Sequence, residues 1–201
     1  MSPNVKRPSG HHHGDLRRVL EEAALELLAT KGIGGVTMAE ASRRAGVSVA
    51  APYKHYADRD ALLAALVLRA FTEQRERYRI AMAEVDDPGE QLAAFAAAYV
   101  RFAADRPALF TLTFAAGLDK ARFPPLAEAG QALFAELSVP ARALCGDDDR
   151  ARRLVLAIAA CAHGQAVFLT EGVFADLADP LSGAEHEAAT AAAALVAAYA
   201  E

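Results

Sequence analysis

Apolar residues return every three or four positions along most of this chain, which is the spacing of one face of an α-helix. No segment alternates apolar and polar residues as a convincing strand does. Alanine, the strongest helix former, makes up about a quarter of the 201 residues. We therefore predict an all-α fold with about nine helices. The clearest apolar stripe consists of Leu16, Val19, Leu20, Ala23, Ala24, Leu27 and Leu28.

Capping residues, glycines and prolines mark where these helices begin and end. Asp15 is expected to cap the first helix, and Gly32 to close it. Thr37 and Glu40 have the spacing of a capping box, in which each side chain bonds the other residue's amide, and open a short second helix. The helices after position 86 are expected over about 88–104, 107–116, 126–144 (after Pro124 and Pro125), 147–171 and 184–200.

Composition excludes several classes of protein. Apolar residues make up 54% of the chain and charged residues 23%, which is unlike a disordered chain. The sequence has no uncharged apolar run of about 18 residues and no signal-peptide pattern at its start, so we expect no membrane span and a cytoplasmic location. Cys145 and Cys161 are too few for a disulfide framework, and both are predicted to be small buried apolar groups.

Charge is spread unevenly along the sequence. Residues 1–70 hold ten Lys or Arg and seven Asp or Glu, a balance of +3, whereas residues 71–201 hold eleven and nineteen, a balance of −8. The asymmetry hints that the N-terminal part meets a polyanion. The run His11–His13 belongs either to a native arm or to a tag remnant, and it does not by itself predict a metal site.

The segment 37–56 has the outline of a helix-turn-helix, with a short capped helix, a turn centred on Gly46 and a second short helix capped by Ser48. This second short helix, the third of the chain, should end before Asp58, which caps a fourth helix from Arg59 to about Glu84. In the third helix we expect Pro52 and Tyr56 to face inward. The side chains expected to point outward are Val49, Ala50, Tyr53 and Lys54.

The outward face suits DNA. Ser48 and the free amides of the first turn can hold a phosphate, and Tyr53 and His55 can donate to phosphate oxygens. Lys54 can reach a guanine edge or a phosphate, and the small residues beside it allow close approach to a thymine methyl group. The alternative is a helical hairpin that serves only as core. The candidate DNA-contacting residues are Thr37, Arg43, Ser48, Val49, Ala50, Ala51, Tyr53, Lys54, His55 and Arg59.

Residues 11–66 resemble the DNA-binding domain of the tetracycline-repressor (TetR) family. The resemblance rests on the turn Gly46-Val47-Ser48, on the Tyr-x-x-aromatic pattern over 53–56 and on the following segment 58–62. It implies phosphate contacts from Thr37, Tyr53 and Arg59, and base-facing positions at Val49, Ala50 and Lys54. Pro52 departs from the family pattern, in which an aliphatic residue is usual. We accordingly divide the chain into an arm (1–14), a helix-turn-helix domain (15–62) and a helical regulatory and dimerisation domain (63–201).

The C-terminal part resembles more loosely the regulatory domains named for a Trp-His-Gly motif, on residues 99–114 and 162–172, although the chain has no Trp and matches the motif only at His163-Gly164. Phenylalanines here, Phe95 and Phe123 among them, are core residues when taken singly, but together they suggest an apolar cavity for a small molecule. His163 is either a satisfied core histidine or a polar group of that cavity. The candidate ligand contacts are Phe102, Phe110, Phe114, Phe134, His163 and Phe168.

The resemblance also implies a homodimer formed through the last two helices, about 150–172 and 184–200, which are rich in alanine. The expected function is a ligand-responsive repressor of a palindromic operator in double-stranded DNA, without a cofactor or metal. Two alternatives are a helical DNA-binding protein that binds no ligand and a helical-bundle enzyme. The sequence offers the enzyme no Glu-x-x-His pair, no His-Glu-x-x-His motif and no glycine-rich phosphate loop.

Overall fold

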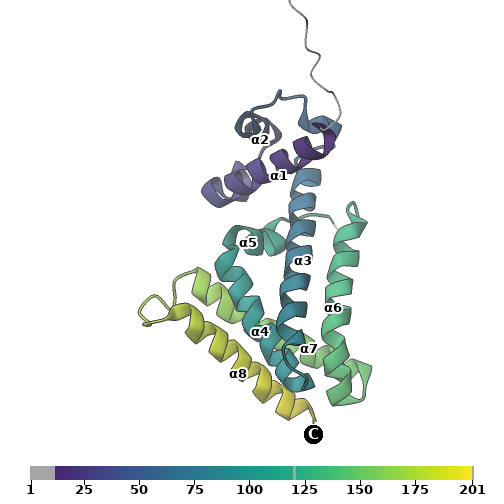
Figure 1. Cartoon of the computed structure of the whole chain (residues 1–201), viewed down its shortest axis with the longest axis vertical. Helices are drawn as coiled ribbons and strands as arrows, with labels where there is room; N and C mark the ends of the chain where they lie inside the picture. Colours follow the sequence, from purple (N-terminus) through teal and green to yellow (C-terminus); the bar gives the residue numbers. More distant parts are fainter. Residues whose placement is uncertain (1–11, 120, 201) are drawn as a thin grey trace, which may run out of the picture. The chain divides into compact units, whose positions relative to one another are not determined.

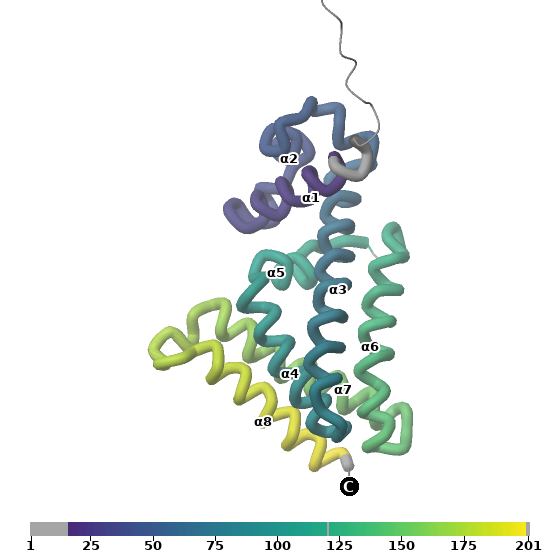
Figure 2. The backbone as a smooth tube through the Cα atoms, in the orientation of Figure 1, coloured from purple at the N-terminus to yellow at the C-terminus, as the bar shows by residue number. Residues whose placement is uncertain are grey.

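The computed structural model describes residues 12–119 and 121–200, and this part contains α-helices and two short 3₁₀-helices but no strand. The prediction of an all-α fold is thus confirmed (Figures 1 and 2). The elements are α1 (His12–Lys31), η1 (Ile33–Gly35), α2 (Met38–Ala45), η2 (Pro52–Lys54), α3 (Arg59–Ala83), α4 (Pro88–Asp105), α5 (Pro107–Ala115), α6 (Pro124–Cys145), α7 (Asp148–Thr170) and α8 (Pro180–Ala200).

The chain divides into two compact units between Leu66 and Val67, inside α3. In the N-terminal unit, the apolar stripe predicted for α1 provides the core: Leu20, Ala24 and Leu27 are fully buried. Ala41 of α2 is also fully buried, and so is Leu62 at the start of α3. Because each helix buries one apolar face, the periodicity of the sequence accounts for this unit directly.

Local signals set the turns between these helices. The Thr37 hydroxyl accepts a hydrogen bond from the Glu40 amide at 3.1 Å, as predicted for the N-cap of α2. The reciprocal half of the capping box is absent, because the Glu40 carboxylate accepts from Lys31 and Arg43 instead. Gly46 ends α2 with φ +68°, a left-handed conformation that glycine adopts without steric cost.

Two predictions for the N-terminal unit are wrong. Helix α1 begins at His12 and not after Asp15. The arm predicted over 1–14 falls largely on residues 1–11, which lie outside the described residues.

The third predicted helix is reduced to the single turn η2. Proline has no amide proton, so Pro52 cannot donate to the Ser48 carbonyl, and that carbonyl accepts instead from the Ala51 amide at 2.9 Å. The Lys54 and His55 amides likewise bond three residues back, to Ala51 and Pro52. Eight α-helices consequently stand in the described residues where we expected about nine.

In the C-terminal unit, α4 packs against α6, α7 and α8, and α7 also packs against α6 and α8. The tube in Figure 2 traces this bundle from α4 to α8. Asp87 caps α4 through the Gly89 and Glu90 amides, and Asp147 caps α7 in the same way through its own following amides. The predicted boundaries of α3 to α7 are confirmed to within one or two residues.

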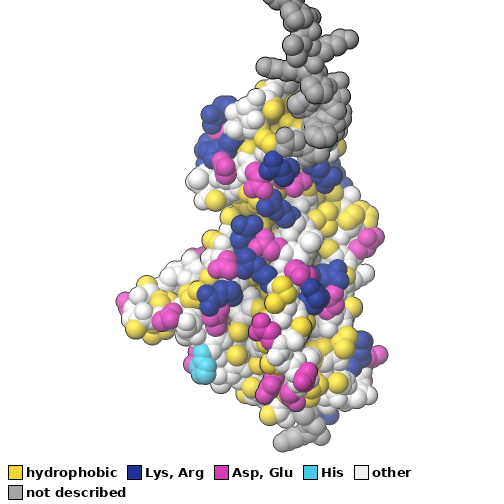
Figure 3. Space-filling model, viewed as in Figure 1, with side chains coloured by type: hydrophobic (Ala, Val, Ile, Leu, Met, Phe, Trp, Pro, Cys, Tyr) yellow, Lys and Arg dark blue, Asp and Glu magenta, His cyan; other side chains and the backbone are white. Residues whose placement is uncertain are grey.

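Ion pairs join helices across the surface of this unit. Arg77 of α3 bonds Asp105 at 2.6 Å, and Arg101 of α4 bonds Glu185 of α8 at 2.6 Å. On the face shown in Figure 3, basic and acidic side chains accordingly lie next to one another over the C-terminal unit. Exposed pairs of this kind contribute little stability individually, so the stability of the bundle depends mainly on its buried apolar residues.

Helix α8 begins at Pro180, four residues earlier than predicted. Proline is well tolerated in the first helical turn, and the Asp179 carboxylate caps the helix through the Ser182 amide at 3.1 Å. The prediction that both cysteines are buried is also wrong: Cys145 is half-buried and Cys161 is exposed. Cys161 falls outside the buried stripe of α7, which includes Ile158 and Ala162.

By length and composition alone, α7 is apolar enough to cross a membrane. A core helix passes the same test, and α7 is buried on one face: Leu154 and Ile158 are fully buried, whereas Leu156 and Phe168 are exposed. One such helix is weak grounds for a membrane assignment.

The turn at Gly46 gives a stability prediction. Substituting Gly46→Ala forces an alanine into the left-handed region and should lower the free energy of unfolding by about 1–2 kcal/mol. A Cβ at Gly46 meets no atom within 4 Å, so the loss is conformational and not steric. Gly34→Ala is the matched control, because its Cβ also meets open space but its φ is not positive. Urea unfolding of both variants measures the difference, and equal effects would contradict this explanation.

Candidate nucleic-acid interface and internal cavity

The segment between α2 and α3 presents the side chains that the sequence analysis placed outward. Val49 is 59% exposed and Tyr53 is 56% exposed, and Lys54 is exposed as well. Pro52 and Tyr56 are buried, as predicted from their spacing. The inward and outward sides therefore agree with the sequence analysis although the segment is not an α-helix.

The remaining candidates of this surface differ in exposure. Thr37, Arg43, Ser48 and Ala50 are exposed, whereas Ala51, His55 and Arg59 are half-buried. All ten candidates come from one stretch of the N-terminal unit, which runs from the N-cap of α2 to the first residue of α3.

Tyr56 holds the segment against α1. Its hydroxyl donates to the Glu21 carboxylate at 2.6 Å, and the Arg17 guanidinium lies 5.7 Å from the ring centroid. Burial, together with the bond to Glu21, raises the pKa of Tyr56 well above its ordinary value. The hydroxyl accordingly stays protonated and remains a donor, so this tether persists across the physiological pH range.

Arg59 ties the start of α3 to the loop that precedes α2. Its guanidinium donates to the Val36 carbonyl and to the Ile33 carbonyl, both at 2.6 Å. The loop that these bonds fix leads directly into Thr37. Arg59 thus has a positioning role that the sequence did not reveal, in addition to the phosphate contact that the resemblance implies.

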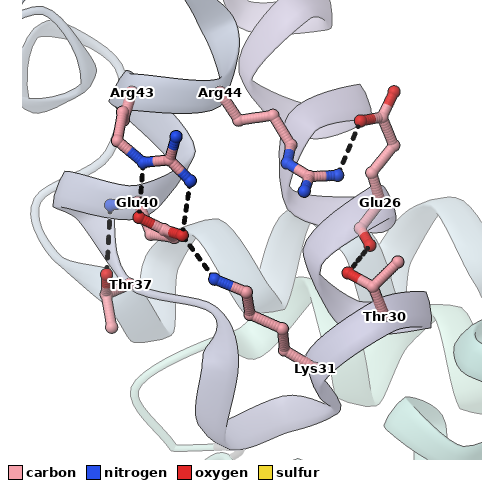
Figure 4. Close-up of polar contacts among 7 residues, drawn as sticks. All are labelled: Glu26, Thr30, Lys31, Thr37, Glu40, Arg43 and Arg44. Atoms are coloured by element: carbon pink, nitrogen blue, oxygen red, sulfur yellow. Dashed lines mark hydrogen bonds and ion pairs between the residues drawn. The ribbon is translucent and has the colours of Figure 1, made fainter.

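A carboxylate stands among the cations of this unit (Figure 4). Glu40 accepts from Arg43 through both of its oxygens, at 2.8 and 2.9 Å, and from the Lys31 ammonium at 2.5 Å. These hydrogen bonds, Arg43 first and Lys31 second, lower the pKa of Glu40 to about 2. Glu26 likewise accepts from Arg44 at 3.0 Å.

The described part of the N-terminal unit has no net charge, counting Lys and Arg against Asp and Glu. Residues 12–66 contain seven Lys or Arg and seven Asp or Glu, so the +3 of residues 1–70 comes from Lys6, Arg7 and Arg69. The first two lie outside the described residues. Lys54 differs from the paired cations, because no carboxylate partner contacts it in the part of the chain that the structure describes.

A cavity of about 1120 Å³ lies within the C-terminal unit. Among its lining residues are Val67, Phe71, Gln74, Tyr78, Phe95, Tyr99, Phe114, Leu126, Phe134, Ser138, Arg142, Asp148, Asp149, Arg152, Val155 and Leu156. Of the six candidate ligand contacts, Phe114 and Phe134 line this cavity.

The other four candidates do not line it. Phe102 is fully buried in α4, and Phe168 is 51% exposed and contacts Phe174. Phe110 and His163 form a cluster beside the cavity wall, with ring centroids 5.4 Å apart. Phe114, one helical turn after Phe110 on α5, reaches the cavity in their place, with its ring centroid 4.5 Å from that of His163.

His163 has a partner in the structure. Its Nδ1 lies 3.0 Å from the Tyr99 hydroxyl, and burial lowers the pKa of His163 below its usual value. The neutral ring can accept a hydrogen bond from the Tyr99 hydroxyl at Nδ1. This geometry is that of a core histidine whose hydrogen bond is satisfied within the protein.

Sequence analysis missed the stripe of α3 that lines the cavity. Val67, Phe71, Gln74 and Tyr78 are spaced by four, three and four residues, which puts them on one helix face. The available signal was a glutamine in an otherwise apolar and aromatic stripe, because burying a polar side chain costs free energy unless it forms hydrogen bonds.

Family comparisons agree with this geometry. A family model described as bacterial regulatory proteins of the tetR family matches residues 20–66, and a second, described as a tetracyclin repressor-like C-terminal domain, matches residues 92–192. The second match alone covers half of the chain. The protein belongs to the TetR family of transcriptional regulators. The N-terminal unit is accordingly its helix-turn-helix DNA-binding domain, and the resemblance stated from the sequence is confirmed.

Solved structures share the fold over nearly the whole chain. A protein of unknown function from Rhodococcus sp. RHA1 is 29% identical, with a TM-score of 0.80 over 96% of this chain and 100% of that chain. A tetR-family regulatory protein from Rhodococcus RHA1 is 20% identical, with a TM-score of 0.69 over 88% of this chain and 95% of that chain.

The fatty acid degradation regulator FadR from Bacillus halodurans is 14% identical, with a TM-score of 0.70 over 93% of this chain and 97% of that chain. At this identity the likeness concerns the fold alone. No curated protein matches the sequence.

The Glu40 network gives a prediction about DNA affinity. Replacing Glu40→Gln frees Lys31 and Arg43 from their carboxylate and should tighten binding to random duplex DNA by about fivefold, the equivalent of roughly 1 kcal/mol. The salt dependence should steepen, because more phosphates are neutralised. Fluorescence anisotropy with a labelled duplex over a salt series measures both quantities.

Glu128→Gln is the control for this experiment. It changes the net charge equally, but Glu128 is an exposed residue of α6 in the C-terminal unit. If both variants tightened binding to the same extent, net charge would explain the effect and the network would not.

Proposed function

We propose that this TetR-family regulator is a homodimeric, ligand-responsive repressor that binds a palindromic operator and is released by a small, largely apolar molecule. The observation that carries the proposal is the exposed surface over residues 48–54 of the helix-turn-helix, where Lys54 extends to solvent without a carboxylate partner among the described residues. Small exposed residues beside a tyrosine and a lysine suit a DNA groove better than a merely solvated surface.

The contacts of the proposed interface follow from residue chemistry. Thr37, Ser48 and Tyr53 present hydroxyls for phosphate oxygens, and these contacts set the orientation on the duplex. Lys54 faces a guanine edge or a phosphate, and Val49 and Ala50 approach a thymine methyl group. In a two-fold dimer, the two recognition segments would be about 34–36 Å apart, one turn of DNA.

Exposure on the last two helices supports the proposed dimer. On α7, Leu156 is 49% exposed and Phe168 is 51% exposed in the single chain. On α8, exposed small residues follow helical spacing at Thr190, Ala193, Ala194 and Ala197. Small side chains allow two helices to approach closely, and a second copy of α7 and α8 would cover these positions in a four-helix interface.

Effector response is proposed to act as a two-state equilibrium. The operator stabilises one arrangement of the dimer, and a ligand in the cavity stabilises another, so each weakens the binding of the other by the same factor. Helix α3 links the two sites in this proposal, because it supplies Arg59 to the DNA-binding domain and four cavity-lining residues to the C-terminal unit. In this proposal the protein is cytoplasmic and performs no catalysis.

Operator binding tests the proposal directly. The full chain should bind the DNA upstream of its own gene more tightly than random DNA, as one dimer on a palindrome. Tyr53→Phe with Lys54→Ala should weaken this binding and reduce the slope of log K against log salt by about one per subunit. Electrophoretic shifts over a salt series measure both effects.

Random-site selection supplies the sequence if the adjacent DNA is not the operator. A protein that selects no sequence, or a double variant with unchanged affinity and slope on the selected one, would contradict the proposed contacts.

The dimer proposal predicts that Ala194→Arg yields a folded monomer with weaker operator binding, because an unpaired charge would be buried in the interface. Sedimentation velocity measures the mass, and circular dichroism verifies the helices. Ala143→Arg, at an exposed alanine of α6, is the control that should leave the dimer intact. A wild-type monomer at micromolar concentration would rule the dimer out.

A further inference from the structure

The cavity contains a buried amide that the fold does not use. The structure describes three buried polar residues, Ser42, Gln74 and Ser138. The hydroxyls of Ser42 and Ser138 donate to carbonyls of their own helices, Met38 at 2.7 Å and Phe134 at 2.8 Å. Gln74 is 3% exposed and lines the cavity, and no described residue forms a hydrogen bond with its amide.

One turn further along α3, Tyr78 repeats the pattern. Its side chain is 1% exposed, and its hydroxyl has no hydrogen-bond partner among the described residues. Tyr99, which also lines the cavity, differs because its hydroxyl is paired with His163. Buried polar atoms are almost always hydrogen-bonded, and the Tyr78 hydroxyl is one that lacks a partner among the described residues. The Gln74 amide, one turn away on the same helix face, borders the cavity without a hydrogen bond to any described residue, so this face of α3 offers two unpaired polar groups to a ligand.

The rest of the lining defines what kind of molecule supplies that partner. Six of the fourteen Phe and Tyr residues of the chain line the cavity: Phe71, Tyr78, Phe95, Tyr99, Phe114 and Phe134. Aromatic walls favour ring systems, which pack edge-to-face or offset against them. The volume of about 1120 Å³ is sufficient for a molecule of several fused rings.

Charge in the lining is confined to exposed positions. The charged lining residues are Arg142, Asp148, Asp149 and Arg152, all exposed, two of each sign, around the end of α6 and the start of α7. No charged lining residue of the described chain comes from α3 or α4. A ligand charge beside Gln74 would therefore be desolvated without a counter-ion, which is costly.

We propose that the cavity takes an uncharged, ring-containing molecule whose carbonyl or hydroxyl oxygen is bound by the Gln74 amide and the Tyr78 hydroxyl. Both side chains can donate to a carbonyl oxygen, and both can also accept from a hydroxyl. This inference rests on the proposed role of the cavity as the effector site, and it names the chemical class of the effector.

Three probes that share the fluorene ring system and differ at C9 test the polar recognition: fluorene, 9-fluorenone and fluorene-9-carboxylate. Isothermal titration of the full chain should find 9-fluorenone bound about tenfold more tightly than fluorene, the equivalent of about 1.4 kcal/mol for the hydrogen bonds gained. The carboxylate should bind more weakly than the ketone. Equal binding of all three probes, tighter binding of the carboxylate, or no binding of any probe would overturn the proposal.

Substitutions test whether Gln74 and Tyr78 are the side chains that bind the ketone oxygen. Gln74→Leu and Tyr78→Phe should each remove much of the preference for the ketone while leaving the binding of fluorene intact, because each substitution keeps the apolar wall and removes an orphaned polar group. Gln165→Leu is the matched control: the Gln165 carbonyl is also buried without a partner among the described residues, but Gln165 does not line the cavity. A ketone preference that survives in Gln74→Leu and Tyr78→Phe would overturn the assignment.

Release of the operator is measured separately. The DNA used is the operator that the unliganded protein binds or selects in the experiments described above. Ketone recognition without release of the operator would leave the inference about the cavity standing and contradict the effector role. Release of the operator by fluorene and 9-fluorenone at equal affinity would support the effector role and overturn the polar recognition.

Discussion

The C-terminal unit depends on helices that approach each other through alanine. On α7, Ala162 and Ala166 are fully buried, and α8 contributes Ala188 and Ala192 one turn apart. An alanine side chain costs no rotamer entropy on burial and keeps the backbones of neighbouring helices close. The contacts of α8 with α4 and α7 are therefore extensive, and they fix the positions of α4 and α7 from one side.

Large side chains have the opposite effect on the other side of the same helices. Where α3, α4 and α6 face the cavity, the lining includes Phe71, Tyr78, Phe95 and Phe134, whose large side chains keep the backbones apart. Aromatic rings of fixed shape do not fill the space between such separated helices, and a cavity remains. The difference between an alanine seam and an aromatic wall thus explains why one side of the bundle is solid and the other is hollow.

Helix existence and helix boundaries could be predicted from the sequence because they depend on local signals. Caps at Thr37, Asp87 and Asp147 and the left-handed Gly46 required no knowledge of tertiary contacts. The short η2 was missed although its cause, Pro52, was visible, because the cost of a lost amide depends on whether a longer helix is packed well enough to tolerate it.

The candidate DNA-binding residues could also be predicted from local signals, whereas the cavity lining could not. Exposure of Tyr53 and Lys54 followed from spacing, whereas the cavity lining required knowing which faces of α3, α4 and α6 meet. Phe102 and Phe114 are both phenylalanines in apolar helices, and nothing local distinguishes the one that is sealed in the core from the one that borders the hollow. Arg59 likewise finds its carbonyl partners 23 and 26 residues away.

The balanced charge of residues 12–66 has a consequence for how such a regulator searches a genome. A DNA-binding surface whose cations are largely matched by carboxylates gains little from counter-ion release on random sequence. Fewer molecules are then held at the many competing sites, so a given operator is filled at a lower copy number. Discrimination then depends on the side chains that are proposed to contact bases, and the predicted effect of Glu40 is to improve selectivity by making indiscriminate binding weaker.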